Sequence, residues 1–295
     1  MSFTKRKTAR KTSHESLHVD IEWHMTFSNL DFGKRVMSLI ELEQTVQLHL
    51  EVMQRDCIND LLKQLHTETE YLDYRYTSAA WMCTVANRLP NRLPSEIRAL
   101  VVTSALDLMD RVMKWHSLEI ILKHSKDIKA ACLDLAIKMH LNDTLVVPSD
   151  LYEDNNEEAM LACEKEIVVQ TKGKIFPYAI DKTISAICNY LLLKYSICTR
   201  TLWDTTCAEL LIKKATSIFS GCFYRSTGCF CIWKIIVTAC ILSLHKYASR
   251  QHRDSLSIVE SRLIQILQGI GMVITEEGLR GLKDEMDRGV CLFFN

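Results

Sequence analysis

Three short runs of this sequence contain residues that protein kinases use in catalysis. They are Asp31-Phe32-Gly33, Ala136-Ile137-Lys138 and His252-Arg253-Asp254. A kinase carries its glycine-rich loop first and the metal-binding Asp-Phe-Gly last, whereas here the Asp-Phe-Gly comes first and no glycine-rich loop is present. The residue five positions after Asp254 is Val259, where the catalytic loop requires a metal-binding Asn. We interpret the three runs as chance and expect a chain without catalytic residues.

The cysteines raise the question of a metal site or a disulfide framework. The sequence has 12 of them, but it opens on a basic, polar stretch and not on a secretory signal, which favours reduced thiols in a cytosolic or nuclear protein. Cys222, Cys229 and Cys231 lie close together, yet the Cys-x2-Cys pairing and the matching histidines of a zinc site are missing. We therefore expect no metal and no other cofactor.

Asp110 is an acidic residue in a run that helical spacing predicts to be buried. Residues 95–116 are apolar in almost every direction around a helix, which is typical of a central buried helix. A buried carboxylate needs a charged or hydrogen-bonding partner. Arg75, in the preceding predicted helix, can supply one, so we expect a structural clamp between Arg75 and Asp110.

Glu164 and Lys138 are charged residues at apolar faces of two further predicted helices. Glu164 interrupts a stripe made of Met160, Ile167, Val168 and Thr171. A charge in such a stripe usually has a partner, and spacing leaves open whether that partner is internal or another protein. Taken alone, the spacing of Lys138 favours an i, i+4 surface pair with Asp134.

Helices must position these residues, because the chain is poor in residues that break helices. No glycine occurs between Lys34 and Lys172. Apolar periodicity predicts helices over residues 37–65, 74–89, 95–116, 125–140, 157–171, 178–195, 202–219, 233–247 and 254–267. Gly173 and Pro177 interrupt this series and mark a boundary between two helical units. The predicted fold class is all-α.

The stretch from Tyr74 to Ile180 resembles the cyclin box. Arg75 and Trp81 resemble the arginine and tryptophan of the first box helix, and Ala105–Arg111 resembles the second helix with its Asp-Arg pair. Leu135–Lys138 resembles the Leu-Ala-Ser-Lys of the third helix. Glu164, thirteen residues before Pro177, resembles the glutamate of the fifth.

The resemblance implies two tandem five-helix cyclin folds with an additional N-terminal helix. We accordingly expect a basic, partly disordered head at residues 1–36, an N-terminal helical segment at 37–72, a first cyclin fold at 73–176, a second at 177–277 and an acidic-hydrophobic tail at 278–295. By the same resemblance, Arg75 and Asp110 form the internal clamp of cyclins. Lys138 and Glu164 match the lysine and glutamate that bind a cyclin-dependent kinase beside its mobile regulatory helix.

Departures from the cyclin pattern narrow what the resemblance implies. Cell-cycle cyclins carry Met-Arg-Ala-Ile-Leu in the first box helix, and Tyr74–Ser78 stands there instead, which puts substrate docking by that patch in doubt. Ala80 replaces an aspartate, and Met139–Leu141 follows the box lysine in place of an acidic pair. The chain is more similar to transcription-type or viral cyclins. Its length, basic head and acidic, Phe-containing tail resemble the retroviral cyclins of fish retroviruses.

Two terminal segments invite functional interpretations that stay open. The head carries Lys5, Arg6, Lys7, Arg10 and Lys11. This cluster is either a nuclear import signal or a solvated tail. The tail carries Asp284, Glu285, Asp287, Leu292, Phe293 and Phe294. Acidic residues beside bulky apolar ones resemble an activation segment, whereas the alternative is a frayed terminus or one that packs Phe293 onto the body.

The expected partner is a cyclin-dependent kinase bound as a heterodimer, with a transcription-associated kinase as one candidate and transcription co-factors as further partners of the tail. A net charge of +0 gives no reason to expect direct binding of nucleic acid or membrane. The most apolar stretch, residues 228–244, contains Lys234 and is predicted to be a buried core helix. We expect a nuclear protein with some cytoplasmic population. The alternative is a helical transcription adaptor that acts through its tail without kinase activation.

Overall fold

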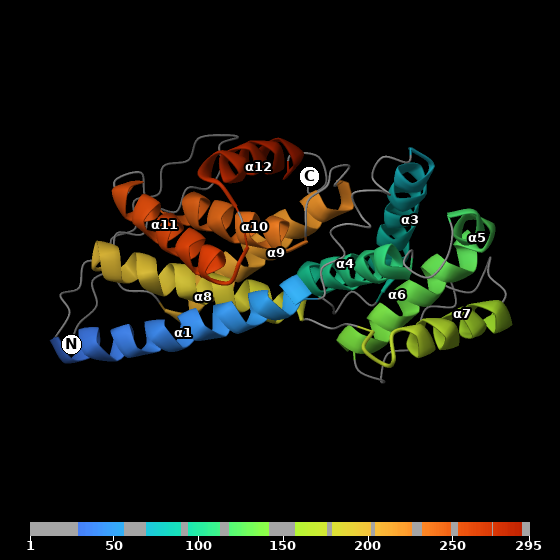
Figure 1. Ribbon diagram of the computed structural model, residues 1–295, viewed down its shortest axis with the longest axis horizontal. Coiled ribbons are helices and arrows are strands. Elements are labelled where there is room, and N and C mark those ends of the chain that lie inside the picture. Colours follow the sequence, from blue (N-terminus) through green and yellow to red (C-terminus); the bar gives the residue numbers. More distant parts are fainter. Residues whose placement is uncertain are drawn as a thin grey trace, which may run out of the picture.

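The computed structural model describes residues 29–55, 69–89, 94–112, 118–141, 157–175, 179–201, 204–225, 232–248, 253–272 and 274–290. Within these ranges every regular element is a helix, which confirms the all-α prediction (Figure 1). The helices are α1 (Asn29–Arg55), α3 (Thr69–Arg88), α4 (Ser95–Val112), α5 (Leu118–Lys123), α6 (Ser125–Leu141), α7 (Glu157–Gln170), α8 (Ile180–Thr199), α9 (Thr205–Arg225), α10 (Ile232–Tyr247), α11 (Arg253–Gly269) and α12 (Glu276–Val290). The finer expectation of two tandem cyclin folds stays a prediction.

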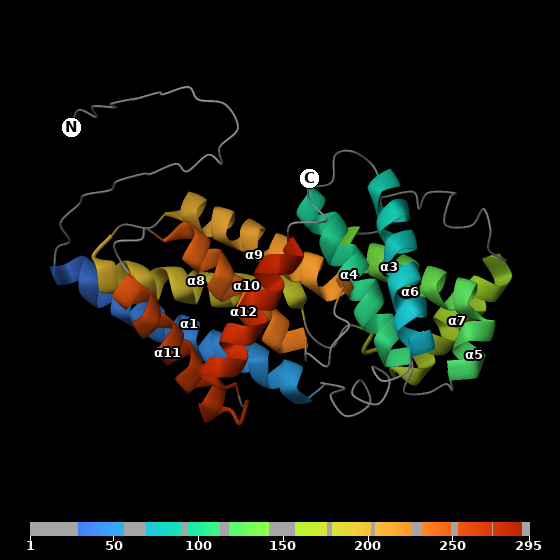
Figure 2. The same ribbon diagram turned by 90° about the horizontal axis from the view of Figure 1, so that it is seen from above.

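The helices form two groups that lie side by side along the long axis of the molecule (Figures 1 and 2). Helices α3 to α7 make the first group, and α8 to α12 make the second. The N-terminal helix α1 lies along α8 and also contacts α10 and α11, so it packs on the second group although it precedes the first in the sequence. Helix α4 packs against α9 and joins the two groups.

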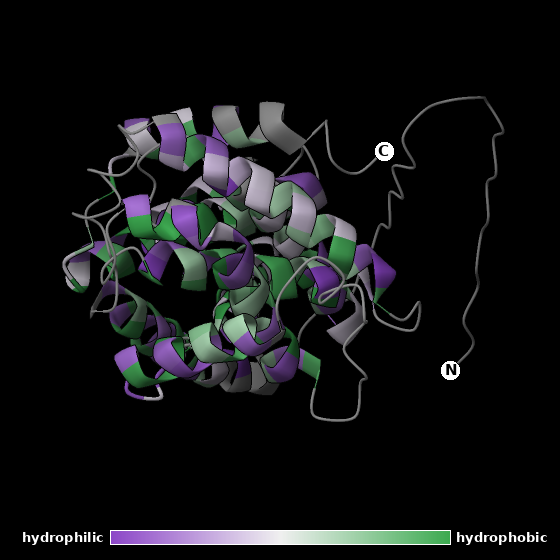
Figure 3. Ribbon diagram, turned by 90° about the vertical axis from the view of Figure 1, so that its right-hand side faces the viewer, coloured by the Kyte–Doolittle hydropathy of each residue, from purple (hydrophilic) through white to green (hydrophobic). Residues whose placement is uncertain are grey.

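Helix α4 is the buried centre of the first group. It begins at Ser95, directly after Pro94, a residue that suits the start of a helix and not its interior. Every residue from Ala99 to Val112 is buried, because α4 packs against α3, α6 and α9. The prediction of a central buried helix is confirmed over the described part of residues 95–116. By contrast, hydrophilic and hydrophobic residues alternate along many of the helices visible from the first-group end (Figure 3).

Helix α10 is the most apolar element of the second group. Its residues are buried from Ile232 to Leu244 with the exception of Lys234, which is partly exposed over the ring of Trp233 at 5.5 Å. In the part of the chain that the structure describes, no helix has the length and apolar character needed to cross a membrane. The interpretation of this stretch as a core helix is confirmed for its described part.

Helix α7 is followed by two consecutive residues with left-handed backbone conformations. Lys172 has φ 51° and Gly173 has φ 74°. The amide of Gly173 donates to the carbonyl oxygen of Val168 at 2.9 Å, and that of Lys172 to Val169 at 3.0 Å, which satisfies carbonyl groups left free at the end of a helix. The chain can therefore turn between α7 and α8, at the predicted boundary between the two units.

Two of the predicted segment boundaries differ from the observed helices. The predicted tail, 278–295, overlaps α12, where Leu279, Leu282 and Met286 are buried against the second group. Gly278 and Gly281 dilute the apolar pattern of this segment, so periodicity did not predict the helix. Helix α1 begins at Asn29, inside the predicted head of residues 1–36. The six-residue helix α5 was also not predicted, because it is too short for a periodic signal.

Candidate functional site

Arg75 and Asp110 form the buried ion pair that the sequence predicts. The Nε atom of Arg75, on α3, lies 3.0 Å from Oδ1 and 3.1 Å from Oδ2 of Asp110, on α4. The hydroxyl of Tyr71 donates a further hydrogen bond to Oδ1. Burial alone lowers the pKa of Arg75, but the adjacent carboxylate outweighs this effect and the pKa of the guanidinium is raised. The clamp holds α3 against α4 and offers no group for catalysis.

The clamp extends to the second group through Phe223 of α9. The Nη1 atom of Arg75 donates to the carbonyl oxygen of Phe223 at 3.1 Å, and the guanidinium lies 4.9 Å from the centre of the Phe223 ring. Tyr71 was not predicted, because it precedes the predicted start of its helix, and neither was Phe223, whose contact is too distant in sequence for any spacing to reveal. The Arg75 guanidinium therefore connects α3, α4 and α9.

A second buried arginine holds the segment that joins the two groups. The Nη2 atom of Arg111 donates to Oδ2 of Asp107, one helical turn earlier, and to the carbonyl oxygen of Ile175, each at 2.8 Å. Ile175 lies just after the left-handed turn at Gly173. The i, i+4 spacing of Asp107 and Arg111 was a signal for this pair, but the contact with the connector was not predictable from it.

Lys138 of α6 and Glu164 of α7 lie in contact, as their predicted positions on two helix faces allow. The ammonium nitrogen of Lys138 lies 2.9 Å from Oε1 and 3.0 Å from Oε2 of Glu164. It also lies 2.5 Å from Oδ2 of Asp134, so the i, i+4 pair that spacing favours for Lys138 is present as well. One ammonium group thus serves two carboxylates from two helices.

The three groups of this acidic cluster, Asp134, Lys138 and Glu164, differ in their contact with solvent. The side chain of Lys138 is 46% exposed, that of Glu164 is 11% exposed and that of Asp134 is fully buried. Burial and the nearby Asp134 raise the pKa of Glu164 to about 7, against the opposing effect of Lys138. Burial lowers the pKa of Lys138, but its hydrogen bonds to Asp134 and Glu164 outweigh this effect and raise it. Lys138 and a small part of Glu164 can therefore contact solvent, whereas the carboxylate of Asp134 cannot.

Exposed apolar side chains flank the acidic cluster. Met139 follows Lys138 directly, and Leu161 precedes Glu164 by less than one helical turn; both are exposed. The indole of Trp81 on α3 is partly buried and is covered by the ammonium group of Lys129 of α6, 4.7 Å from the ring centre. Apolar side chains and charged groups thus lie next to each other on the surface of α6 and α7.

A serine and a histidine also meet between α4 and α6. The Oγ atom of Ser104 lies 2.9 Å from Nε2 of His140, whose pKa is lowered by burial. Ser104 is buried in the middle of α4, which leaves a substrate no access to its hydroxyl. The contact therefore joins two helices and does not make Ser104 a nucleophile.

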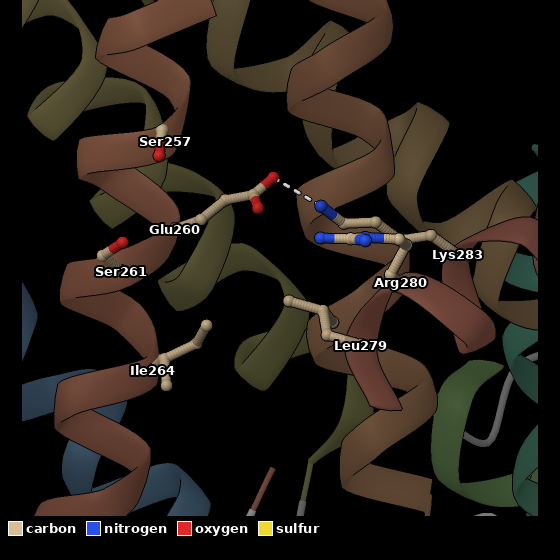
Figure 4. Close-up of a pocket in the computed structure, with 7 residues that line it drawn as sticks. All are labelled: Ser257, Glu260, Ser261, Ile264, Leu279, Arg280 and Lys283. Atoms are coloured by element: carbon tan, nitrogen blue, oxygen red, sulfur yellow. Dashed lines mark hydrogen bonds and ion pairs between the residues drawn. The ribbon is translucent and has the colours of Figure 1, made fainter. Parts of the chain in front are cut away.

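A pocket of about 190 Å³ lies between α11 and α12 (Figure 4). Its wall is formed by Ser257, Glu260, Ser261, Ile264, Leu279, Arg280 and Lys283. Glu260 contacts Nε2 of His245 and lies 2.5 Å from the ammonium of Lys283, and these bonds lower its pKa although burial opposes them. The carboxylate thus joins α10, α11 and α12, and its charge is satisfied internally.

The metal and disulfide expectations concern residues that are partly outside the described ranges. Among the described residues, no group of three or more His, Cys, Asp or Glu side chains could hold a metal ion. The described cysteines, at positions 83, 132, 163, 188, 198, 207, 222 and 240, are free thiols. Cys229 and Cys231 lie outside the described residues.

Both terminal candidate segments fall largely outside the described residues as well. The basic cluster at Lys5, Arg6, Lys7, Arg10 and Lys11 precedes the first described residue, and Leu292, Phe293 and Phe294 follow the last. Asp284 is exposed on α12, and the side chains of Glu285 and Asp287 are not described. The nuclear import role of the basic cluster and the activation role of the tail stay predictions.

Comparison with known proteins gives no assignment: no protein-family model matches the chain, and no curated protein matches it either.

Proposed function

We propose that this chain is a regulatory, cyclin-like subunit that binds and modulates a cyclin-dependent kinase and thereby affects transcription of host or viral genes. The observation that carries the proposal is the contact of Lys138 with Glu164 at a partly exposed edge of α6 and α7. These two residues are the ones that the cyclin-box resemblance assigns to the kinase.

The surroundings of the pair support a protein partner. Lys138 and Glu164 come from two long helices that pack together, so their positions are fixed before a partner arrives. The exposed side chains of Met139 and Leu161 supply apolar area beside the charges. Charged groups in such an interface fix orientation and register more than they add affinity.

The proposed mechanism is a shift in the kinase population and needs no catalytic residue from this chain. A regulatory subunit can bind the active conformation of a kinase more tightly than the inactive conformation. Its binding then increases the active fraction, and the difference between the two affinities determines by how much. In an active kinase, the glutamate of the mobile helix pairs with the catalytic lysine. Contact at the α6–α7 edge would hold that helix in its active position.

The test is a pull-down of tagged cyclin-dependent kinases with the full chain and with the double variant Lys138→Ala, Glu164→Ala. Loss of kinase binding in the variant is the expected result. The matched control is Glu96→Ala, Lys213→Ala, which removes an ion pair of the same 2.9 Å length between α4 and α9. Binding that survives in the double variant at the parent level would overturn the proposed interface. Transcriptional activity without capture of any kinase would favour the adaptor that acts through its tail.

A further inference from the structure

The acidic cluster of Asp134, Lys138 and Glu164 contains more negative than positive charge. It has two carboxylates and one ammonium group, so full ionisation leaves one excess negative charge. A lysine ammonium has three N–H donors. Its nitrogen lies 2.5 Å from Oδ2 of Asp134 and 2.9 and 3.0 Å from the two oxygens of Glu164, so one cation serves both acids. Lys138 can therefore neutralise only one of the two carboxylates that it contacts.

In the described part of the chain, the helices around the cluster bring no second cation into contact with its carboxylates, since Arg111 of α4, the helix that packs on α6, is paired with Asp107. Helix α7 packs on α6, and the titratable groups of α6 that face Glu164 are Asp134, Lys138 and the thiol of Cys132. Burial raises the pKa of the Cys132 thiol, which keeps it neutral. Lys165 and Glu166, the next residues on α7, are both exposed. Among the described residues, Lys138 is the cation that contacts these carboxylates.

We infer that the partner of this site presents a cationic side chain, an arginine or a lysine, to Glu164. The inference rests on the proposed function and adds the chemistry of the contact. Charge complementarity is its basis: the side chain of Asp134 is fully buried, whereas that of Glu164 keeps a small exposed surface toward an approaching cation. A guanidinium group suits this role because it donates two parallel hydrogen bonds to one carboxylate.

In the absence of a partner, a proton bound to Glu164 can neutralise the excess negative charge of the cluster. The pKa of Glu164, raised to about 7 by burial and by Asp134, means that a proton partly neutralises the cluster near neutral pH. A partner cation would lower the pKa of Glu164 in the complex, so binding would release this proton. Affinity for the partner should therefore rise as the pH increases up to about 7, and level off above it.

The first experiment measures the affinity of the full chain for the captured kinase between pH 6 and pH 8. The expected result is an affinity several-fold to about tenfold higher at pH 8, because one proton is linked to binding. Asp134→Asn removes the excess charge and should flatten this dependence, and circular dichroism checks that the variant folds. Glu96→Gln, at the pair with Lys213, is the control and should keep the parent's pH profile.

The second experiment is a double-mutant cycle between Glu164→Gln and alanine variants of the exposed arginines and lysines on the kinase. One of these residues should show a coupling of about tenfold or more in affinity, since it alone contacts the carboxylate. The inference would be overturned if binding depends on Glu164 but no basic residue of the kinase is coupled to it and the affinity does not change with pH. That result would leave the proposed function standing. Kinase binding that is indifferent to Glu164 would overturn both.

Discussion

Arg75 on α3 donates a hydrogen bond to the carbonyl oxygen of Phe223 on α9, 148 residues later in the sequence, at 3.1 Å. Phe223 lies in the last turn of α9, where backbone carbonyl groups lack partners within the helix. A cation there also interacts favourably with the helix dipole. The same guanidinium pairs with Asp110, so one buried side chain satisfies a carboxylate of the first group and a helix end of the second.

Replacement of Asp110 by alanine should destabilise the chain by about 3–5 kcal/mol, because Arg75 would remain buried without its counter-ion. Both side chains of this pair are almost fully buried, so solvent offers little compensation. Chemical denaturation followed by circular dichroism measures the change. Glu96→Ala is the control, since Glu96 is partly exposed, its partner Lys213 is exposed, and the pair should contribute about 0–1 kcal/mol. An Asp110→Ala chain that unfolds like its parent would show that the clamp adds no stability.

Tyr71→Phe should cost about 1–3 kcal/mol of stability, because it removes a donor from a buried carboxylate while the ring still fills its site. Tyr76→Phe, on the exposed side of the same helix, should change stability by less than about 0.5 kcal/mol. Denaturant midpoints of the two variants give the comparison. Equal midpoints would mean that the Tyr71 hydroxyl contributes nothing to the clamp.

The sequence was sufficient to predict contacts that follow from helix periodicity. Asp110 and Glu164 stood out because each places a charge on an apolar face, and both prove to be buried beside a cation. The i, i+4 relation of Lys138 to Asp134 was equally visible. Periodicity defines which residues share a face of a helix, and this is the information that a single sequence contains.

Contacts that depend on how helices pack across the chain were not predictable in this way. Nothing in the spacing of Phe223 points to Arg75, because their contact depends on how α3 and α9 pack against each other. The position of α1 along α8 has the same origin. The full burial of Asp134 also depends on packing, since its helix face alone suggested a surface pair with Lys138.

Glu164 should make the stability of the chain depend on pH in a defined direction. Its pKa is raised in the folded chain, from the usual 4.5 to about 7, so the folded state binds the proton more tightly than the unfolded state. The stability that this proton supplies is present below pH 4.5 and is lost as the pH rises to about 7. The loss should be on the order of 1–3 kcal/mol.

This dependence is measured as the difference in unfolding free energy between the parent and Glu164→Gln at pH 5 and at pH 8. The glutamine cannot ionise, so the parent should lose stability relative to it as the pH rises. Other carboxylates, such as Glu260 with its lowered pKa, are present in both chains and drop out of the difference. A difference that is constant across this range would show that Glu164 ionises normally.

Gly173→Ala should destabilise the chain by about 1 kcal/mol, because φ at this position is 74° and an alanine is strained there. No atom lies within 4 Å of the added Cβ, so the cost is conformational and not a clash. Gly269→Ala is the matched control, since that site is equally open but not left-handed, and it should be neutral or stabilising by up to about 1 kcal/mol. Thermal unfolding of both variants tests the turn between the two groups.

Two truncations separate the acidic, Phe-containing tail from the helix that precedes it. Deletion of residues 291–295 removes Leu292, Phe293 and Phe294 but leaves α12 complete. Deletion of residues 284–295 also removes Met286, which is buried against the second group, and should cost on the order of 2–5 kcal/mol of stability. If the terminal residues activate transcription, the shorter deletion should lower the output of a reporter gene while stability and kinase binding stay at the parent level. Undiminished output from that chain would show that the terminal residues are inert, and a loss confined to the longer deletion would trace the effect to unfolding of α12.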